Sequence, residues 1–137
     1  MESREPVAMT FVTQDSPARR YAEAFVEAAY AQAFASRLSV HYPVLACLVS
    51  PDEKILGVVG LRYAEQERLF LECYLDHPIE VALGATFGQR PDRAQVAEIG
   101  ALACSPKLSP QLFLALAAHL EAQGRCFATA AATRRLR

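Results

Sequence analysis

Val96-Ala97-Glu98-Ile99-Gly100-Ala101-Leu102-Ala103-Cys104 is apolar except for one carboxylate. A stretch of this kind predicts a central β-strand that is covered on both faces. A polar loop over 105–110 follows it, and then come a helical pattern and a second short apolar run over 125–131. The order strand, helix, strand predicts a βαβ unit. The rest of the chain can be placed around this unit.

The helix of this unit is predicted by an apolar stripe. Leu112, Leu116 and Leu120 recur every four residues, which places them on one helix face. Ser109 precedes Pro110 and is a good N-cap residue, so we expect the helix to start there. A buried acid on a central strand, next to outward-facing N–H groups at a helix N-terminus, suggests a place to bind an anionic ligand beside a proton acceptor.

The segments before this unit predict a single domain, residues 1–137, with a mixed α/β fold. We expect a strand over 7–14, a long helix over 18–38, a hairpin of strands over 44–49 and 55–62, an extended segment over 69–75, and a helix over 77–87 capped by Asp76. This order predicts a central mixed β-sheet flanked by helices and is typical of the GNAT-type acyltransferase architecture.

Composition narrows the classes of partner. Lys plus Arg number 14 and Asp plus Glu number 15, so no global field favours nucleic acid or an anionic membrane. No stretch is long and apolar enough for a membrane span or a signal peptide. The cysteines are widely separated, without metal-ligand spacing, and we expect them to be buried thiols in a reducing, cytoplasmic setting. The four cysteines are Cys47, Cys73, Cys104 and Cys126. No metal site is expected.

Five phrases of the chain together resemble the thermostable hemolysin family in order and approximate spacing. They cover residues 42–45, 57–62, 69–80, 96–103 and 129–137. That family is similar in fold to the GNAT superfamily and, more distantly, to the acyl-homoserine-lactone synthases. The resemblance implies that the pantetheine arm of an acyl carrier lies along the strand that carries Glu98. It also implies an N-acyltransferase that moves an acyl group from an acyl-CoA or acyl-carrier-protein thioester to a small amine.

Two departures from the family pattern favour an alternative. Ala101 stands where the family usually has Asn, and the match stops at Arg137, where family members continue through another helix and further strands. The C-terminal part of the fold is therefore expected to be missing, and a homodimer would have to complete the acceptor side. The alternative is a non-catalytic binding or assembly module of the same family. A third hypothesis is a membrane-active hemolysin, and it rests on the family name alone.

Glu98 is the candidate general base. A carboxylate buried without a partner readily takes up a proton, as a base that deprotonates an amine must do. The structural alternative is an ion pair with an arginine such as Arg62, Arg90 or Arg93, or a place facing a solvated groove.

The candidate donor-binding residues follow Glu98 along the same strand and loop. Backbone groups of the strand end would hold a pantetheine amide, and N–H groups of the loop would hold a phosphate. Against this, the loop lacks the glycine-rich signature of typical GNAT enzymes, and its two prolines remove donors. Glu72 and Tyr74 are the candidate acceptor-binding residues, with purely structural roles as the alternative. The donor set is Leu102, Ala103, Cys104, Ser105, Lys107 and Ser109.

Overall fold

Five strands form one mixed sheet, in which their spatial order is the same as their order in the chain. The computed structural model describes residues 8–34 and 42–130. Neighbouring strands from β1 to β4 are antiparallel, and β5 is parallel to β4. The strands are β1 (Ala8–Thr13), β2 (Val44–Val49), β3 (Ile55–Tyr63), β4 (Val96–Cys104) and β5 (Phe127–Thr129). This architecture confirms the predicted mixed sheet, and β2 and β4 have the predicted bounds.

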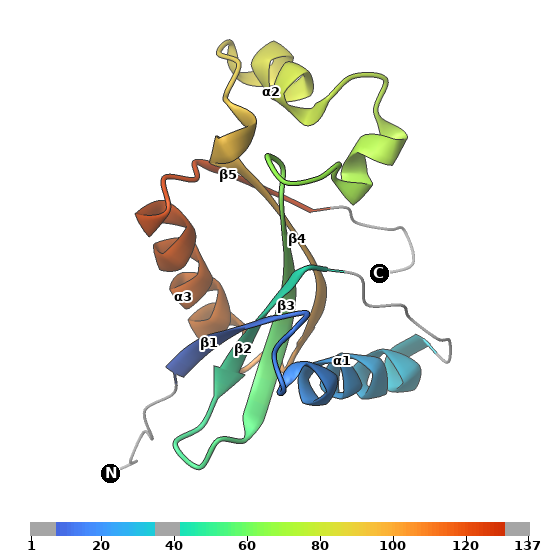
Figure 1. Cartoon of the computed structure of the whole chain (residues 1–137), viewed down its shortest axis with the longest axis vertical. Helices are drawn as coiled ribbons and strands as arrows, with labels where there is room; N and C mark the ends of the chain where they lie inside the picture. The colour runs from blue at the N-terminus through green and yellow to red at the C-terminus, as the bar shows by residue number, and fades with distance from the viewer. Residues whose placement is uncertain (1–7, 35–41, 131–137) are drawn as a thin grey trace.

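Helices cover both faces of the sheet (Figure 1). On one face, α3 (Ser109–Ala122) packs its leucine stripe against β2 and β3 side chains such as Ala46 and Leu61. On the other face, α1 (Arg19–Phe34) packs Ala22 and Val26 against the alternate residues of the same strands. Because both faces are covered, the central strands are apolar apart from Arg62 on β3 and Glu98 on β4, and do not alternate with polar residues.

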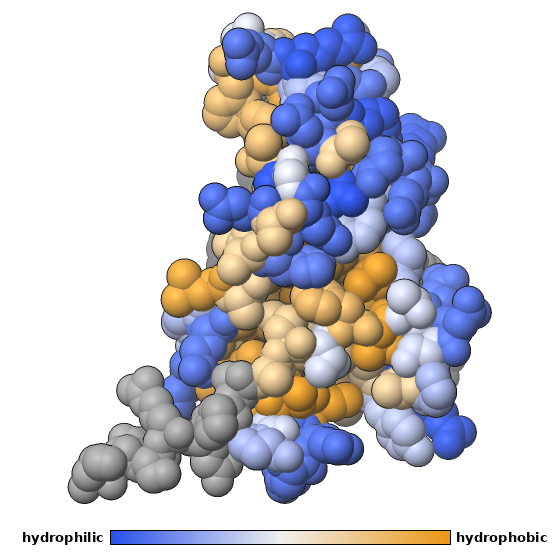
Figure 2. Space-filling view, turned by 60° about the vertical axis from the view of Figure 1, so that its left-hand side comes forward, coloured by the Kyte–Doolittle hydropathy of each residue, from blue (hydrophilic) through white to orange (hydrophobic). Residues whose placement is uncertain are grey.

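Between β3 and β4 the chain leaves the sheet, and we call residues 64–95 the β3–β4 connection. It contains the 3₁₀ turn η1 (Phe70–Tyr74), the helix α2 (Ile79–Phe87) and the 3₁₀ turn η2 (Arg93–Gln95). Leu69 and Ile79 form a small core of their own with Val96 at the start of β4. The connection lies beyond one end of the sheet (Figure 1), and its surface is largely hydrophilic in the view of Figure 2.

The predicted extended segment over 69–75 is wrong, because its centre folds as η1. The carboxylate of Glu72 accepts the Leu69 N–H at 2.8 Å, and that of Glu98 accepts the N–H groups of Phe70 and Leu71. A strand would need those N–H groups for a neighbouring strand. Two carboxylates, one of them 28 positions from Phe70, therefore stabilise a turn where the local pattern favoured extension.

Two predicted helix caps are also wrong. The helix α2 begins at Ile79, whose N–H is accepted by Glu72 and not by Asp76, because the buried carboxylate of Glu72 approaches to 2.7 Å. At α3 the N-cap is Leu108, and Ser109 is already helical. Its hydroxyl donates to the carbonyl of Ser105 at 3.0 Å.

The expectation that all four cysteines are buried is confirmed only for Cys47. Burial raises the pKa of its thiol to about 11. Cys104 is half-buried, whereas Cys73 and Cys126 are exposed because they lie on η1 and just before the short strand β5, where little packs over them. The C-terminal end of the helix predicted over 18–38, at 35–38, lies outside the described residues. Most of the family-like phrase over 129–137 does as well.

Candidate functional site

The strand β4 has an open backbone edge. On one side it pairs with β3 along most of its length, from Ala97 to Cys104. On the other side it pairs with β5 only from Val96 to Glu98. Within residues 8–34 and 42–130, no strand pairs with 99–104 on that second side. An open edge of this kind is a template on which an extended ligand can form main-chain hydrogen bonds.

A β-bulge bends β4 where the edge opens. Gly60 pairs with Gly100, and Val58 pairs with Ala103, so Val59 faces two residues of β4. One of these two, Ala101, has φ +51°, in the left-handed region that residues with a side chain rarely adopt. Such a conformation costs on the order of 1 kcal/mol and persists because Gly100 before the bulge and Ala103 after it are both paired with β3.

The donor candidates lie at the end of β4 and in the segment that follows it. Leu102 is 37% exposed, Ala103 is buried and Cys104 is half-buried, so the strand end is only partly covered. Ser105 and Lys107 are exposed in the turn that leads into α3. In the described structure no side chain caps the start of α3. The structure therefore brings the predicted donor residues together as one continuous edge and loop.

Glu98 takes the ion pair that sequence reasoning left open as an alternative. Its side chain is almost fully buried, and Arg62 Nη1 donates to Oε1 at 2.9 Å. The Phe70 N–H donates to the same oxygen at 2.9 Å, and the Leu71 N–H donates to Oε2 at 2.7 Å. Three donors thus surround a carboxylate that has almost no contact with solvent. This arrangement compensates the cost of burying the charge.

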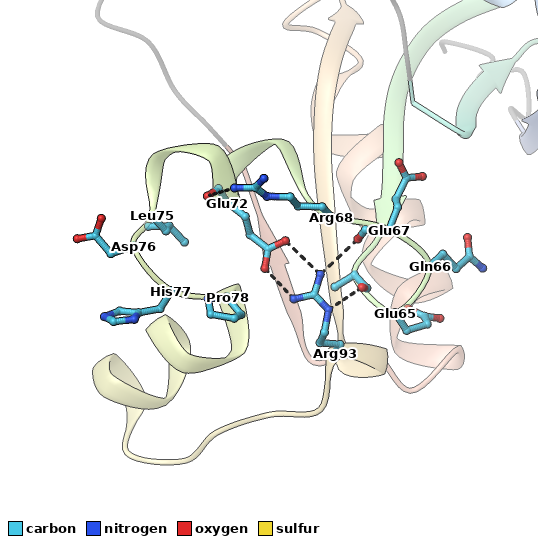
Figure 3. A pocket seen from close by; sticks show the side chains of 11 residues that line it. Glu65, Gln66, Glu67, Arg68, Glu72, Leu75, Asp76, His77, Pro78 and Arg93 are labelled. Carbon is cyan, nitrogen blue, oxygen red and sulfur yellow. Dashed lines mark hydrogen bonds and ion pairs between the residues drawn. The ribbon is translucent and has the colours of Figure 1, made fainter.

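Glu72 is held in a similar way within the β3–β4 connection (Figure 3). Arg93 donates to both of its carboxylate oxygens, at 2.7 and 3.1 Å, and also to Glu80 at 2.8 Å. Hydrogen bonds from Arg93, together with the N–H groups of Leu69 and Ile79, lower the pKa of Glu72 to about 2 although burial opposes the shift. The pKa of Arg93 is raised by the same contacts.

A cavity of about 520 Å³ lies in front of this ion pair (Figure 3). Glu72 and Arg93 form part of its wall, and Arg68, Asp76 and His77 stand at its exposed side. Figure 3 shows the guanidinium groups of Arg68 and Arg93 on either side of the Glu72 side chain. The cavity is therefore lined by charged groups of both signs.

The structure does not bring Tyr74 to this cavity. Tyr74 is 71% exposed and packs edge-on against Phe70, with 5.5 Å between the ring centroids. Glu72 and Tyr74 share η1, but only Glu72 lines the cavity.

Sequence reasoning missed Tyr42, which lies on the sheet beside the bulge. A Cβ on Gly60 or on Gly100 would collide with its ring. A signal for it was present in the sequence, since glycine at Gly60 and at Gly100 within otherwise bulky strands marks a close approach of another group. Only the strand register shows that these two glycines face each other.

The described residues form a mixed α/β protein in which the parallel pairing of β4 with β5 ends after three residues, next to a bulge in β4. The sequence profile of the family described as thermostable hemolysin matches residues 12–137. The chain belongs to the thermostable hemolysin family. A search of curated proteins found no match. Among the described helices, none has both the length and the apolar character that crossing a bilayer requires.

Proposed function

We propose that this protein binds an acyl thioester along the open edge of β4 and transfers the acyl group to a small amine. The thioester is carried by coenzyme A or by an acyl carrier protein. The observation that supports the proposal is that pairing of β5 with β4 ends at Glu98 within the described residues, combined with the bulge at Ala101. The amides of a pantetheine arm suit such an edge, because they can pair with it as an added strand would.

The loop after β4 supports the same placement of the donor. A phosphate at the other end of the pantetheine arm would meet the exposed ammonium of Lys107 and the N-terminal end of α3. Both attract an anion, the second through the helix dipole. The GNAT-like similarity inferred from the sequence implies the same strand for the donor.

The transfer step needs no group beyond the donor, the amine and water. The amine nitrogen forms a bond to the thioester carbonyl carbon, and the carbon–sulfur bond breaks as the carbonyl re-forms. The nitrogen releases one proton to water, and the departing thiolate takes up one. The enclosed carboxylate of Glu98 supports a positioning role in this scheme, since its contacts hold Arg62 and η1 in place.

The second candidate is a binding module of the same family without catalysis. The observation that favours it is the same enclosure of Glu98, together with the methyl side chain of Ala101, which offers no hydrogen-bonding group. Both candidates bind the donor, and only the first releases a thiol when an amine is supplied.

A thermal-shift titration tests donor binding, with coenzyme A, octanoyl-CoA and an octanoyl-loaded acyl carrier protein as probes. A ligand at about 100 times its dissociation constant adds roughly 2.7 kcal/mol to the stability of the folded state, which raises Tm by several degrees. Release of free thiol from octanoyl-CoA and a small primary amine, faster with the protein than without it, then separates the enzyme from the binding module. If no probe raises Tm, the proposed function is wrong.

The two lysines of the chain provide a matched pair of variants. Lys107→Glu places a negative charge in the loop after β4, whereas Lys54→Glu does so in the turn between β2 and β3. We expect the first to weaken coenzyme A binding about fivefold, as loss of an exposed ion pair of about 1 kcal/mol would do. The second should leave binding unchanged. Equal effects of the two variants would contradict the proposed position of the phosphate.

A further inference from the structure

Two glycines on neighbouring strands make a slot for one aromatic ring. Gly60 on β3 and Gly100 on β4 are directly paired. A Cβ on Gly60 would lie 2.6 Å from Cγ of Tyr42, and a Cβ on Gly100 would lie 2.6 Å from Cζ. Both distances are far inside van der Waals contact, so any larger residue at either position would displace the ring. The ring of Tyr42 therefore lies flat across this pair of glycines.

The orientation of the Tyr42 ring follows from which of its atoms lie near β3 and which lie near β4. Its Cβ–Cγ end lies over β3, and its Cζ–hydroxyl end lies over β4. The next position in the sheet beyond β4 is that of β5, which pairs with β4 only up to Glu98. The hydroxyl of Tyr42 thus points across β4 at Gly100, the residue before the bulge, toward the edge that has opened.

The backbone and the ring of Tyr42 are both anchored. Arg19 on α1 is almost fully buried and donates from Nη2 to the Tyr42 carbonyl at 2.6 Å. The guanidinium of Arg62 stacks on the ring, with Cζ 4.4 Å from the centroid. The same Arg62 is paired with Glu98. The phenol is therefore held in advance of any ligand, as a group that contacts a reacting centre needs to be.

We propose that the Tyr42 hydroxyl donates a hydrogen bond to the thioester carbonyl oxygen of the donor. This inference rests on the proposed function and adds a residue that selects the acyl-loaded carrier. Free coenzyme A carries a thiol in place of the thioester, so it offers no carbonyl oxygen at that point. The contact therefore favours the loaded carrier over the unloaded one. It also strengthens as the carbonyl oxygen becomes negative during attack by the amine.

Calorimetric titration of octanoyl-CoA and of coenzyme A into the wild type and into Tyr42→Phe tests the contact. One neutral hydrogen bond contributes about 1 kcal/mol, so Tyr42→Phe should weaken octanoyl-CoA binding about fivefold and leave coenzyme A binding unchanged. Tyr21→Phe is the matched control, because Tyr21 is exposed on α1 and does not touch the slot. It should change neither affinity.

The infrared carbonyl band of bound octanoyl-CoA gives a second readout, which compares the wild type with Tyr42→Phe. A hydrogen bond to the thioester oxygen lowers the stretching frequency on binding, and Tyr42→Phe should reverse that shift. The contact would be overturned by an unshifted band in the bound wild type, by unchanged octanoyl-CoA affinity in Tyr42→Phe, or by equal losses for both ligands. If the wild type binds neither ligand, the proposed function itself fails, which separates the two outcomes.

Discussion

Two buried carboxylates hold the β3–β4 connection to the sheet. Glu98 is 1% exposed and Glu72 is 5% exposed. Each accepts two backbone N–H groups and pairs with one arginine, so each buried charge has both hydrogen bonds and a counter-ion. Burial without such partners would cost several kcal/mol. At both positions the acid therefore determines a local conformation, the turn η1 and the start of α2.

Glu98→Gln should destabilise the fold. The amide keeps the size of the side chain but removes the buried charge that pairs with Arg62, and breaking a buried pair costs about 3 kcal/mol. Urea unfolding at pH 7 measures the loss, with Glu121→Gln on the exposed side of α3 as the control. Stability equal to that of the control would show that the ion pair contributes nothing. Donor binding should persist in Glu98→Gln while it is folded, because the edge beyond Glu98 is unchanged.

The stabilisation from Glu72 should depend on pH. Its pKa is about 2 in the folded protein, below the ordinary 4.5, so the carboxylate stabilises the fold fully above pH 4.5 and loses that effect as pH falls toward 2. Glu72→Gln should therefore lower the free energy of unfolding by about 3 kcal/mol at pH 7. Urea unfolding at pH 7, 4 and 3 should show this difference shrinking. A difference that stays constant with pH would contradict the assignment.

The strands β3 and β4 together form the slot for Tyr42. A substitution in the slot therefore tests whether the Tyr42 ring packs against this pair of strands. Gly60→Ala should cost about 2 kcal/mol, because the added methyl overlaps the Tyr42 ring. In a Tyr42→Ala background the same substitution should cost much less. Chemical unfolding of the single and double variants gives this coupling directly. Additive losses would mean that the ring does not occupy the slot.

The elements that the sequence predicted well are those whose pattern is local. The run over 96–104 is apolar because the strand is covered on both faces, and the leucine stripe of α3 packs on one of those faces. The prediction of an extended segment over 69–75 was wrong because its conformation depends on a residue distant in the sequence. Its turn depends on the carboxylate of Glu98, which comes from another strand. Patterns within a short segment contain no information about such a partner.

In the candidate site, too, features that depend on local sequence could be predicted, and features that depend on distant residues could not. The donor residues from Leu102 to Ser109 are contiguous, so sequence reasoning could place them on one edge and loop. The slot could not be found that way, because Gly60, Gly100 and Tyr42 meet only through the register of β3 and β4. The separation of β5 from β4 after Glu98 is likewise a property of the assembled sheet.

In the whole molecule, the open edge of β4 and the β3–β4 connection meet at Glu98. The open edge of β4 runs from this residue toward α3, and η1 of the β3–β4 connection is bonded to its carboxylate. Figure 1 shows α1 and α3 on opposite sides of the sheet, with the connection beyond its end. The bonds at Glu98 therefore join the sheet that would hold the donor to the segment that forms the charged cavity.

Hydrogen–deuterium exchange with and without octanoyl-CoA shows which strand of the sheet holds the bound thioester. If the thioester lies along the open edge, the β4 amides between Ile99 and Cys104 that exchange fast in the free protein should slow when octanoyl-CoA binds. Amides of β1, on the far edge of the sheet, should not change. Binding of octanoyl-CoA without slower exchange in this part of β4 would contradict the account.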